Sequence, residues 1–447
     1  MTLTEFVDVV IVGARCAGSA AAISFARAGR SVIAIDAAKF PSSTISTHLL
    51  WAGGVAEVAR LGALERVESL GAPRLPVGFA AIPGAPAIRA TYTPIDGIDY
   101  GLCVRRYGFD AALVDTARAA GAEVREQTQL LELLVEDGRA TGIVVRERGG
   151  RVAELRAKLV VGADGRRSAI AKQLGVSEPT LSHHNERCCF YSYFRDLRGE
   201  WRNVAAQWRA GRELGTAFPC DGGLVLVLLM PPNERAEAFR RDRETAFART
   251  IDQLPGLSDR LAGCPRAERI IGATNLLSYF RRSSGPGWAL VGDAGHFKDP
   301  VTAQGIRDAL RFGRLLAEQT ASVLDDPQQL DHALGNWEAQ RDAECLEVYH
   351  WSNLMGRADE VGPFDVALYE HFSRPEHAHK LLDVHSRLLR PSEVFPMELV
   401  VDVSARPASG DQLAGPITSI GERPELALAR YIARSDRRSA SSAEHPD

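Results

Sequence analysis

A glycine-rich segment near the start of the chain has the residue types and spacing that bind phosphate groups. It reads Gly-Ala-Arg-Cys-Ala-Gly from Gly13 to Gly18, and Asp36 ends the next apolar run. Gly13 permits a tight turn, Gly18 lets a helix lie close to a strand, and the helix N-terminus offers free N–H groups to a pyrophosphate. Asp36 can accept hydrogen bonds from ribose hydroxyls. The segment therefore predicts a dinucleotide site.

The middle of this segment departs from the usual pattern, because Arg15 stands where a further glycine is common. Two interpretations remain open: the guanidinium reaches the phosphates, or it lies solvated at the mouth of the site. The elements around it support a nucleotide site in either case. Residues 6–12 predict a buried strand, residues 19–28 a helix that Gly29 ends, and residues 31–35 a second strand, which together make one βαβ unit.

Two later motifs each follow an apolar run that is typical of a buried strand. A Gly-Ala-Asp-Gly sequence places Asp164 after residues 159–161, and a Gly-Asp-Ala-Gly-His sequence places Asp293 after residues 288–291. Asp-Gly and Gly-Asp are common turn dipeptides, so each motif alone has an ordinary structural explanation. Three motifs in order, each after a buried strand, favour a single nucleotide site.

With these three motifs the sequence resembles the class A flavoprotein monooxygenases, the para-hydroxybenzoate hydroxylase family, over about residues 6–355. Geranylgeranyl-reductase-like proteins and flavin halogenases are neighbours of that family. The last motif is the most specific part of the resemblance. It implies an α/β fold, in which a Rossmann-like (GR2-type) FAD-binding domain carries an antiparallel β-sheet substrate domain and C-terminal helices.

The resemblance implies a role in FAD binding for residues of the last motif and of the segment after it. Asp293, next to Gly292, would bind a ribityl hydroxyl through its carboxylate. Pro300 matches a proline near the flavin ring. Gly305 and Ile306 match the start of a helix whose N–H groups face the N1–C2 carbonyl edge, where a helix N-terminus stabilises negative charge.

The resemblance also implies contacts to the phosphates of FAD. Asp164 would support the pyrophosphate and the binding of a nicotinamide cofactor. Arg106 matches an arginine that approaches the phosphates, and Arg105 could take its place. His48 stands where relatives often have a basic residue near the pyrophosphate, and the sequence leaves its charge undetermined.

Changes in residue composition and hydrophobic pattern along the chain predict its domain organisation. In the substrate lobe, Tyr191 and Tyr193 share one face by strand alternation, and they either line the pocket or fill the core. The expected segments are a first part of the FAD-binding domain at 1–180, the substrate lobe at 181–284, a second part of the FAD-binding domain at 285–325, a C-terminal helical region at 326–403 and a flexible tail at 404–447.

The composition argues against several classes of protein. A net charge of −4 over 447 residues gives no bulk attraction to nucleic acid or membrane surfaces, and no segment is long and apolar enough to span a membrane. No signal peptide is visible, so we expect a cytoplasmic protein. The seven cysteines include no Cys-x-x-Cys pair, so we expect no metal site.

The resemblance implies an enzyme in which NAD(P)H reduces FAD and oxygen then forms a flavin hydroperoxide, which oxygenates an aromatic or electron-rich small molecule. Alternatives are a reductase or dehydrogenase of carbon–carbon double bonds, a halogenase-like enzyme, or a flavin-binding module without turnover. The halogenase signature Trp-x-Trp-x-Ile-Pro is absent, and Phe218-Pro219 is a remnant of the prenyl-reductase signature Tyr-x-Trp-x-Phe-Pro. These absences favour the monooxygenase. No catalytic acid or base stands out, as expected where the flavin carries the chemistry.

Overall fold

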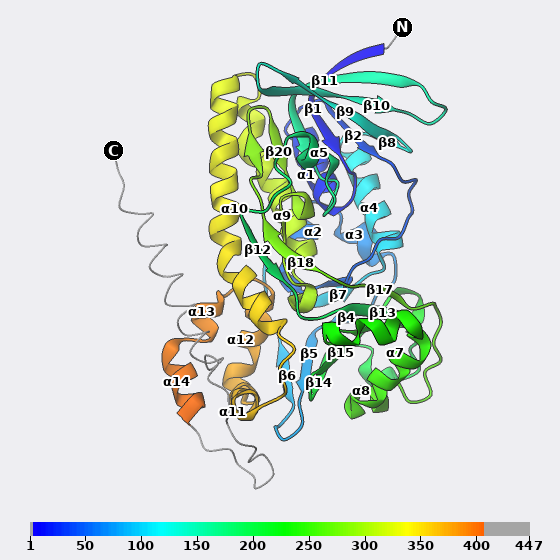
Figure 1. The fold of residues 1–447 in the computed structure, drawn as a ribbon, viewed down its shortest axis with the longest axis vertical. Coiled ribbons are helices and arrows are strands. Elements are labelled where there is room, and N and C mark those ends of the chain that lie inside the picture. Colours follow the sequence, from blue (N-terminus) through cyan, green and yellow to red (C-terminus); the bar gives the residue numbers. More distant parts are fainter. Residues whose placement is uncertain (1–2, 406–447) are drawn as a thin grey trace.

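The computed structural model describes residues 3–405, and a sheet of eight strands occupies the upper part of the molecule in Figure 1. Its central strand β1 (Leu3–Val12) pairs in parallel with β2 (Val32–Asp36) and β11 (Val152–Gly162). These strands are apolar and rich in β-branched residues, as strands buried on both faces are. The other strands are β8 (Glu123–Glu126), β9 (Gln129–Glu136), β10 (Arg139–Arg146), β19 (Ser284–Gly285) and β20 (Trp288–Leu290).

Helices cover this sheet and bring two helix N-termini to the same end of it. α1 (Cys16–Arg27) connects β1 to β2, and α9 (Gly305–Thr320) packs against α1. The close approach depends on small residues: a Cβ added to Gly18 would lie 1.8 Å from the carbonyl oxygen of Gly13. The other helices of this part are α2 (Ala52–Arg60), α3 (Leu64–Glu68), α4 (Arg106–Ala119) and α5 (Ala169–Gln173).

A second, mainly antiparallel sheet of seven strands lies at the other end of the molecule (Figure 1). Two of its strands, β5 (Val77–Ala81) and β6 (Ile88–Thr91), come from the first part of the chain and join through parallel pairing of β5 with β14. This α/β architecture with a second, antiparallel sheet confirms the predicted fold class. The remaining strands are β13 (Cys189–Arg195), β14 (Val204–Ala210), β15 (Glu213–Cys220), β16 (Leu224–Leu229) and β17 (Ile271–Ala273).

The seven-stranded sheet buries both of its faces. One face packs against α6 (Ala236–Arg241), α7 (Arg243–Asp252) and α8 (Pro255–Arg260). On the opposite face the rings of Tyr191 and Tyr193 lie 5.9 Å apart, which confirms that the two share a face. We call this opposite face, together with Ala303 which packs on it, the inner apolar face; its side chains include Tyr191, Tyr193, Leu214, Phe218, Leu226 and Leu228.

Two small sheets connect the ends of the molecule. One consists of β3, β7 and β4, and the other of β12, β18 and β21. Leu49 of β3 and Cys103 of β7 pack in the same apolar cluster as the inner apolar face, so this small sheet covers part of that face. The bounds are β3 (Leu49–Leu50), β4 (Arg74–Leu75), β7 (Gly101–Cys103), β12 (Leu181–His184), β18 (Leu277–Phe280) and β21 (His296–Phe297).

The C-terminal part is helical, as predicted, and α10 (Pro327–Met355) runs along one side of the molecule between its two ends (Figure 1). The predicted flexible tail lies outside the described residues from residue 406 onward. None of the helices within 3–405 combines the length and apolar character that crossing a membrane requires. The last helices are α11 (Pro363–Phe372), α12 (Pro375–His385), α13 (Pro391–Val394) and α14 (Met397–Ala405).

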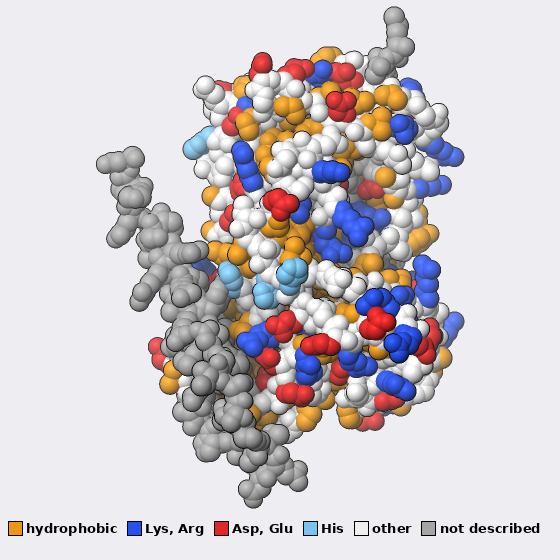
Figure 2. All heavy atoms as spheres, viewed as in Figure 1, with side chains coloured by type: hydrophobic (Ala, Val, Ile, Leu, Met, Phe, Trp, Pro, Cys, Tyr) orange, Lys and Arg blue, Asp and Glu red, His pale blue; other side chains and the backbone are white. Residues whose placement is uncertain are grey.

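Charged side chains of both signs are spread over the face of the molecule seen in Figure 2, and Lys and Arg side chains gather near its middle. The chain as a whole has 53 basic and 57 acidic residues.

Candidate functional site

A cavity of about 690 Å³ lies where the carboxyl ends of β1, β2 and β11 meet the N-termini of α1 and α9. Ligands of open α/β sheets bind at this edge, because the helix N-termini and the connecting loops converge there. Three of the predicted cofactor-binding residues, Gly18, His48 and Arg105, do not line it, and neither do the pocket-wall candidates Tyr191 and Tyr193. Those that do are Gly13, Arg15, Asp36, Arg106, Asp164, Gly292, Asp293, Pro300, Gly305 and Ile306.

One end of the cavity has the features of an adenosine ribose site. Asp36 is fixed at the end of β2, because its Oδ2 accepts a hydrogen bond from the Ala14 N–H at 2.9 Å and its Oδ1 accepts one from the Ala38 N–H at 2.8 Å. Each carboxylate oxygen can accept a further bond, so ribose hydroxyls can still bind.

The turn from β1 into α1 exposes backbone donors to the cavity. Gly13 has a φ of +99°, and a Cβ there would lie 2.4 Å from the carbonyl oxygen of Ala163. No side chain caps α1, since Arg15 occupies the N-cap position without such a bond. The first N–H groups of the helix are therefore available to an anion such as a pyrophosphate.

Two arginines beside this turn share one buried carboxylate. Arg106 donates to Asp110 from Nε and Nη2, at 2.8 and 3.0 Å, and Arg15 donates to Asp110 at 2.5 Å and to Ser42 Oγ at 2.9 Å. Arg15 is therefore a paired side chain, a quarter exposed, rather than a freely solvated one. Two cations against one anion leave one positive charge at the cavity wall, which suits a pyrophosphate.

Two further carboxylates in the wall have incomplete hydrogen bonding. Asp164 Oδ2 accepts from the N–H groups of Ala169 and Ile170, while its buried Oδ1 has no partner within the described residues. The Asp293 carboxylate likewise has no hydrogen bond among residues 3–405. Burial raises the pKa of both groups. Carboxylates in this state fit a ligand that brings hydroxyl donors, as the ribose and ribityl parts of FAD do.

The opposite end of the cavity is formed by the start of α9. Gly305 and Ile306 line it, and a Cβ added to Gly305 would meet no atom within 4 Å, so the helix N-terminus opens into free space. Gln304 does not cap the helix; its Nε2 donates instead to the carbonyls of Val384 and His385, each at 3.0 Å. The C-terminal helices therefore fix the position of this helix start.

His48 and Arg105 have partners away from the cavity. His48 is 2% exposed with a φ of +63°, its Nδ1 lies 2.7 Å from the Ser46 carbonyl, and its Nε2 lies 2.8 Å from Tyr193 Oη. Burial, and then the charge of Arg106, lower its pKa to about 3, so His48 carries no charge toward a phosphate. Arg105 binds Asp221 through Nε at 2.7 Å.

Several wall residues belong to no sequence motif. Residues 44–47 form one side of the cavity, and Lys298 and Asp299 lie beside Pro300. Asp299 is 3% exposed, and its Oδ1 accepts a hydrogen bond from the Val301 N–H at 2.9 Å, which fixes the turn before α9. Burial raises the pKa of Asp299 to about 7. The sequence around residues 44–47, Lys298 and Asp299 did not indicate that these residues line the cavity.

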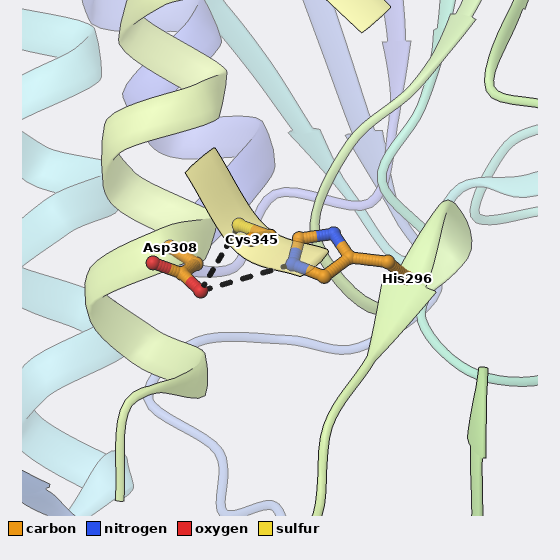
Figure 3. Close-up of side chains that lie close together, drawn as sticks. All are labelled: His296, Asp308 and Cys345. Carbon is orange, nitrogen blue, oxygen red and sulfur yellow. Dashed lines mark hydrogen bonds and ion pairs between the residues drawn. The ribbon is translucent and has the colours of Figure 1, made fainter. Parts of the chain in front are cut away.

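A second buried group beside the cavity has the composition of a metal site. His296, Asp308 and Cys345 lie together on β21, α9 and α10 (Figure 3), with ligand atoms within 4.8 Å of one another. The Asp308 carboxylate is already bound by the ammonium of Lys298 and by Arg307 Nη1, the latter at 2.9 Å. Two cations on the carboxylate oppose the approach of a metal cation, so the group is an ion-pair cluster.

Comparison with known proteins identifies the ligand for which this site is built. Residues 6–339 match the family described as "FAD binding domain". The chain belongs to this family. Together with the incompletely hydrogen-bonded carboxylates and the uncapped helix N-termini that line the cavity, the match shows that the protein is an FAD-dependent oxidoreductase.

Relatives of stated activity align with most of the chain. A digeranylgeranylglycerophospholipid reductase from Methanocella arvoryzae is 28% identical over 348 residues, covering 74% of this chain and 82% of that protein. A menaquinone reductase from Mycolicibacterium smegmatis is 32% identical over 334 residues, covering 70% and 76%. The fold is also that of the flavin-dependent brominase Bmp2, with a TM-score of 0.75 at 17% identity, covering 97% of this chain and 100% of that one.

Proposed function

We propose that the protein is an FAD-dependent reductase of carbon–carbon double bonds in an apolar substrate. Two groups of relatives that align over 70% or more of the chain are named as reductases, one of a geranylgeranyl phospholipid and one of menaquinone. The names of these relatives favour a reductase. The absence of the halogenase and prenyl-reductase signatures from the sequence had favoured a monooxygenase instead. The proposal for this chain is limited to the bond type and the apolar character of the substrate.

The observation that carries the proposal is the position of Ala303. This residue lines the FAD cavity just ahead of α9, and it also packs on the inner apolar face of the seven-stranded sheet. The two features therefore share a boundary. An apolar substrate that lies on the inner apolar face would meet FAD at this boundary, away from water.

The residues around the cavity provide binding for each part of FAD. Asp36 would bind the adenosine ribose, and Arg15 and Arg106 would face the pyrophosphate together with the N-terminus of α1. Asp293 would accept a hydrogen bond from the ribityl chain. When bound, FAD supplies the two-electron chemistry. We propose NADH or NADPH as the electron donor.

The tyrosines of the inner apolar face can orient a polar group of the substrate. Burial raises the pKa of Tyr191 to about 12 and raises that of Tyr193 further, so both hydroxyls stay protonated at neutral pH. Tyr193 is bonded to His48, whereas the Tyr191 hydroxyl has no hydrogen-bond partner among residues 3–405. Tyr191 can therefore donate to a carbonyl of a quinone-like substrate.

A monooxygenase is the second candidate, and one observation favours it. Tyr191, Tyr193 and Phe218 present aromatic rings on one buried face, which also suits a flat aromatic ligand. An aromatic substrate and the use of oxygen follow from the sequence resemblance alone. Turnover with and without oxygen separates the two candidates.

The proposal is tested with FAD-loaded protein that has been photoreduced without oxygen. Mixing with a geranylgeranyl glycerophospholipid in detergent, or with menaquinone whose ring has first been reduced to the quinol, should reoxidise the flavin and give a product with two additional hydrogen atoms on one double bond of the lipid chain. Saturated analogues of the same lipids serve as controls. If neither unsaturated lipid reoxidises the flavin faster than its saturated analogue, double-bond reduction of these two classes is excluded.

A further inference from the structure

A lysine and an aspartate form a buried ion pair beside the FAD cavity. Lys298 follows β21, Asp308 lies in the first turns of α9, and the ammonium contacts Asp308 Oδ2 directly. The two side chains are 3% and 2% exposed. Burial lowers the pKa of Lys298, whereas the contact with the carboxylate favours the charged ammonium.

Positive charge exceeds negative charge in this cluster. Besides Lys298, Asp308 faces Arg307 Nη1 at 2.9 Å and Arg387 Nη1 at 3.9 Å. His296 is close as well, but burial and the nearby cations lower its pKa well below the usual range, so it stays neutral. Three cations therefore surround one carboxylate. Asp293 also acts on Lys298 and Glu57 on Arg307, so the positive charge around Asp308 is partly balanced, and an anionic group beside Lys298 would balance it further.

The order of groups within FAD determines which anion this is. Asp36 and the α1 N-terminus offer contacts for the adenosine and pyrophosphate parts of FAD, and Asp293 lines the same cavity. The remaining end contains Lys298 and the open N-terminus of α9 at Gly305, and it borders the inner apolar face. The flavin ring is the part of FAD left for this end, and it gains negative charge when it is reduced.

We propose that the Lys298–Asp308 pair sets the reduction potential of the flavin, with Lys298 stabilising the charge gained on reduction and Asp308 limiting that effect. Lys298 is thus a positioning and electrostatic residue, which acts through charge close to the ring. The helix N-terminus of α9 acts in the same direction. The proposal rests on FAD occupying the cavity and is independent of the substrate.

The experiment measures the flavin midpoint potential of purified holoprotein without substrate, in excess FAD. Lys298→Met should lower the equilibrium constant for reduction at least tenfold, which is about 30 mV for a two-electron couple. Asp308→Asn should raise it by a similar factor, because it removes the anion and leaves the cations. Lys298→Arg should change it less than about threefold, because the charge is retained.

Lys158→Met is the matched control, since Lys158 also binds two aspartates, Asp8 and Asp325, but lies far from this cavity on β11. Opposite shifts for Lys298→Met and Asp308→Asn support the proposal, because general damage to the site would move both in one direction. Equal potentials for Lys298→Met, Lys158→Met and the unchanged protein overturn it. If Asp308→Asn does not fold, the difference between Lys298→Met and Lys298→Arg decides: a shift for Met alone supports the proposal, and equal shifts overturn it.

Discussion

At the scale of single residues, the cavity is defined by carboxylates whose hydrogen bonds are incomplete. Asp36 is fixed by two backbone N–H groups, Asp164 has one buried oxygen without a partner in residues 3–405, and Asp293 accepts no bond to its carboxylate there. A buried carboxylate that lacks donors is unfavourable unless a ligand supplies them. We therefore propose that these side chains contribute to the free energy of FAD binding rather than to that of folding.

Asp293→Ala should weaken FAD binding by roughly ten- to a hundredfold, the loss expected for a charge-assisted hydrogen bond of about 1.5–3 kcal/mol. Asp252→Ala is the control, because Asp252 is an exposed carboxylate at the end of α7 on the far lobe. The FAD dissociation constants of both variants would be measured by flavin fluorescence quenching. A dissociation constant for Asp293→Ala equal to that of the control would contradict the assignment.

His48 gives a prediction for stability against pH. Its folded pKa of about 3 lies below the ordinary 6.5, so the unfolded chain binds the proton first and stability is lost as the pH falls below 6.5. Between pH 7 and 5 this loss is about 2 kcal/mol for one such group. In the His48→Asn variant, asparagine tolerates the positive φ at this position. Its free energy of unfolding, measured with denaturant, should therefore fall by about 2 kcal/mol less between pH 7 and pH 5 than that of the unchanged protein.

The control for this prediction is His332→Asn on α10, where the histidine is exposed. It should keep the pH dependence of the unchanged protein, because the substitution makes the same change of residue type at an exposed side chain on another element. Identical pH dependence in the His48 and His332 variants would show that His48 is not held neutral.

The residues that could be predicted from the sequence are those whose role depends on a local motif. Asp36, Asp164 and Asp293 each stand at a fixed distance from a strand end, and all three line the cavity. Lys298 and Asp308 were not predicted, because their contact depends on how β21 packs against α9. His48 was assigned to the pyrophosphate, but the structure turns it toward Tyr193 of the other sheet, a contact that no local spacing shows.

At the scale of elements, contacts with other parts of the chain determine the residue at which α9 begins. The resemblance placed Gly305 and Ile306 at the start of a helix, and α9 begins at Gly305, after a short 3₁₀ turn that Asp299 caps and after Ala303 with a φ of +50°. Propensity could not place this boundary, because it depends on backbone hydrogen bonds within a buried loop. The strands of the βαβ unit and helix α10 were predicted well, because periodicity alone defines them.

Gln304→Ala should loosen the start of α9, because it removes two hydrogen bonds to the last turn of α12, one to the carbonyl of Val384 and one to that of His385. We expect a loss of about 1–3 kcal/mol in the free energy of unfolding and flavin release at a lower temperature. Gln319→Ala, on the same helix but bonded to Gln340 of α10, is the control. Flavin release at the same temperature in both variants would show that α12 does not position the helix start.

At the scale of the whole molecule, the two sheets are not built from separate stretches of chain. β5 and β6 precede the predicted substrate lobe at 181–284, yet they complete its sheet through the pairing of β5 with β14. Residue composition and hydrophobic pattern could not show that β5 and β6 belong to this sheet, because the pairing joins strands more than a hundred residues apart. The arrangement places the inner apolar face beside the part of the cavity that Ala303 lines. The central claim is that FAD and an apolar double bond meet there.

Product analysis under labelled oxygen and in deuterated water tests that claim most directly. Turnover with NAD(P)H and an unsaturated lipid or quinone should give a product that contains deuterium at one former double bond and no labelled oxygen. The yield should be the same when oxygen is absent. A product that carries one labelled oxygen atom, or a reaction that stops without oxygen, would contradict the reductase and establish the monooxygenase.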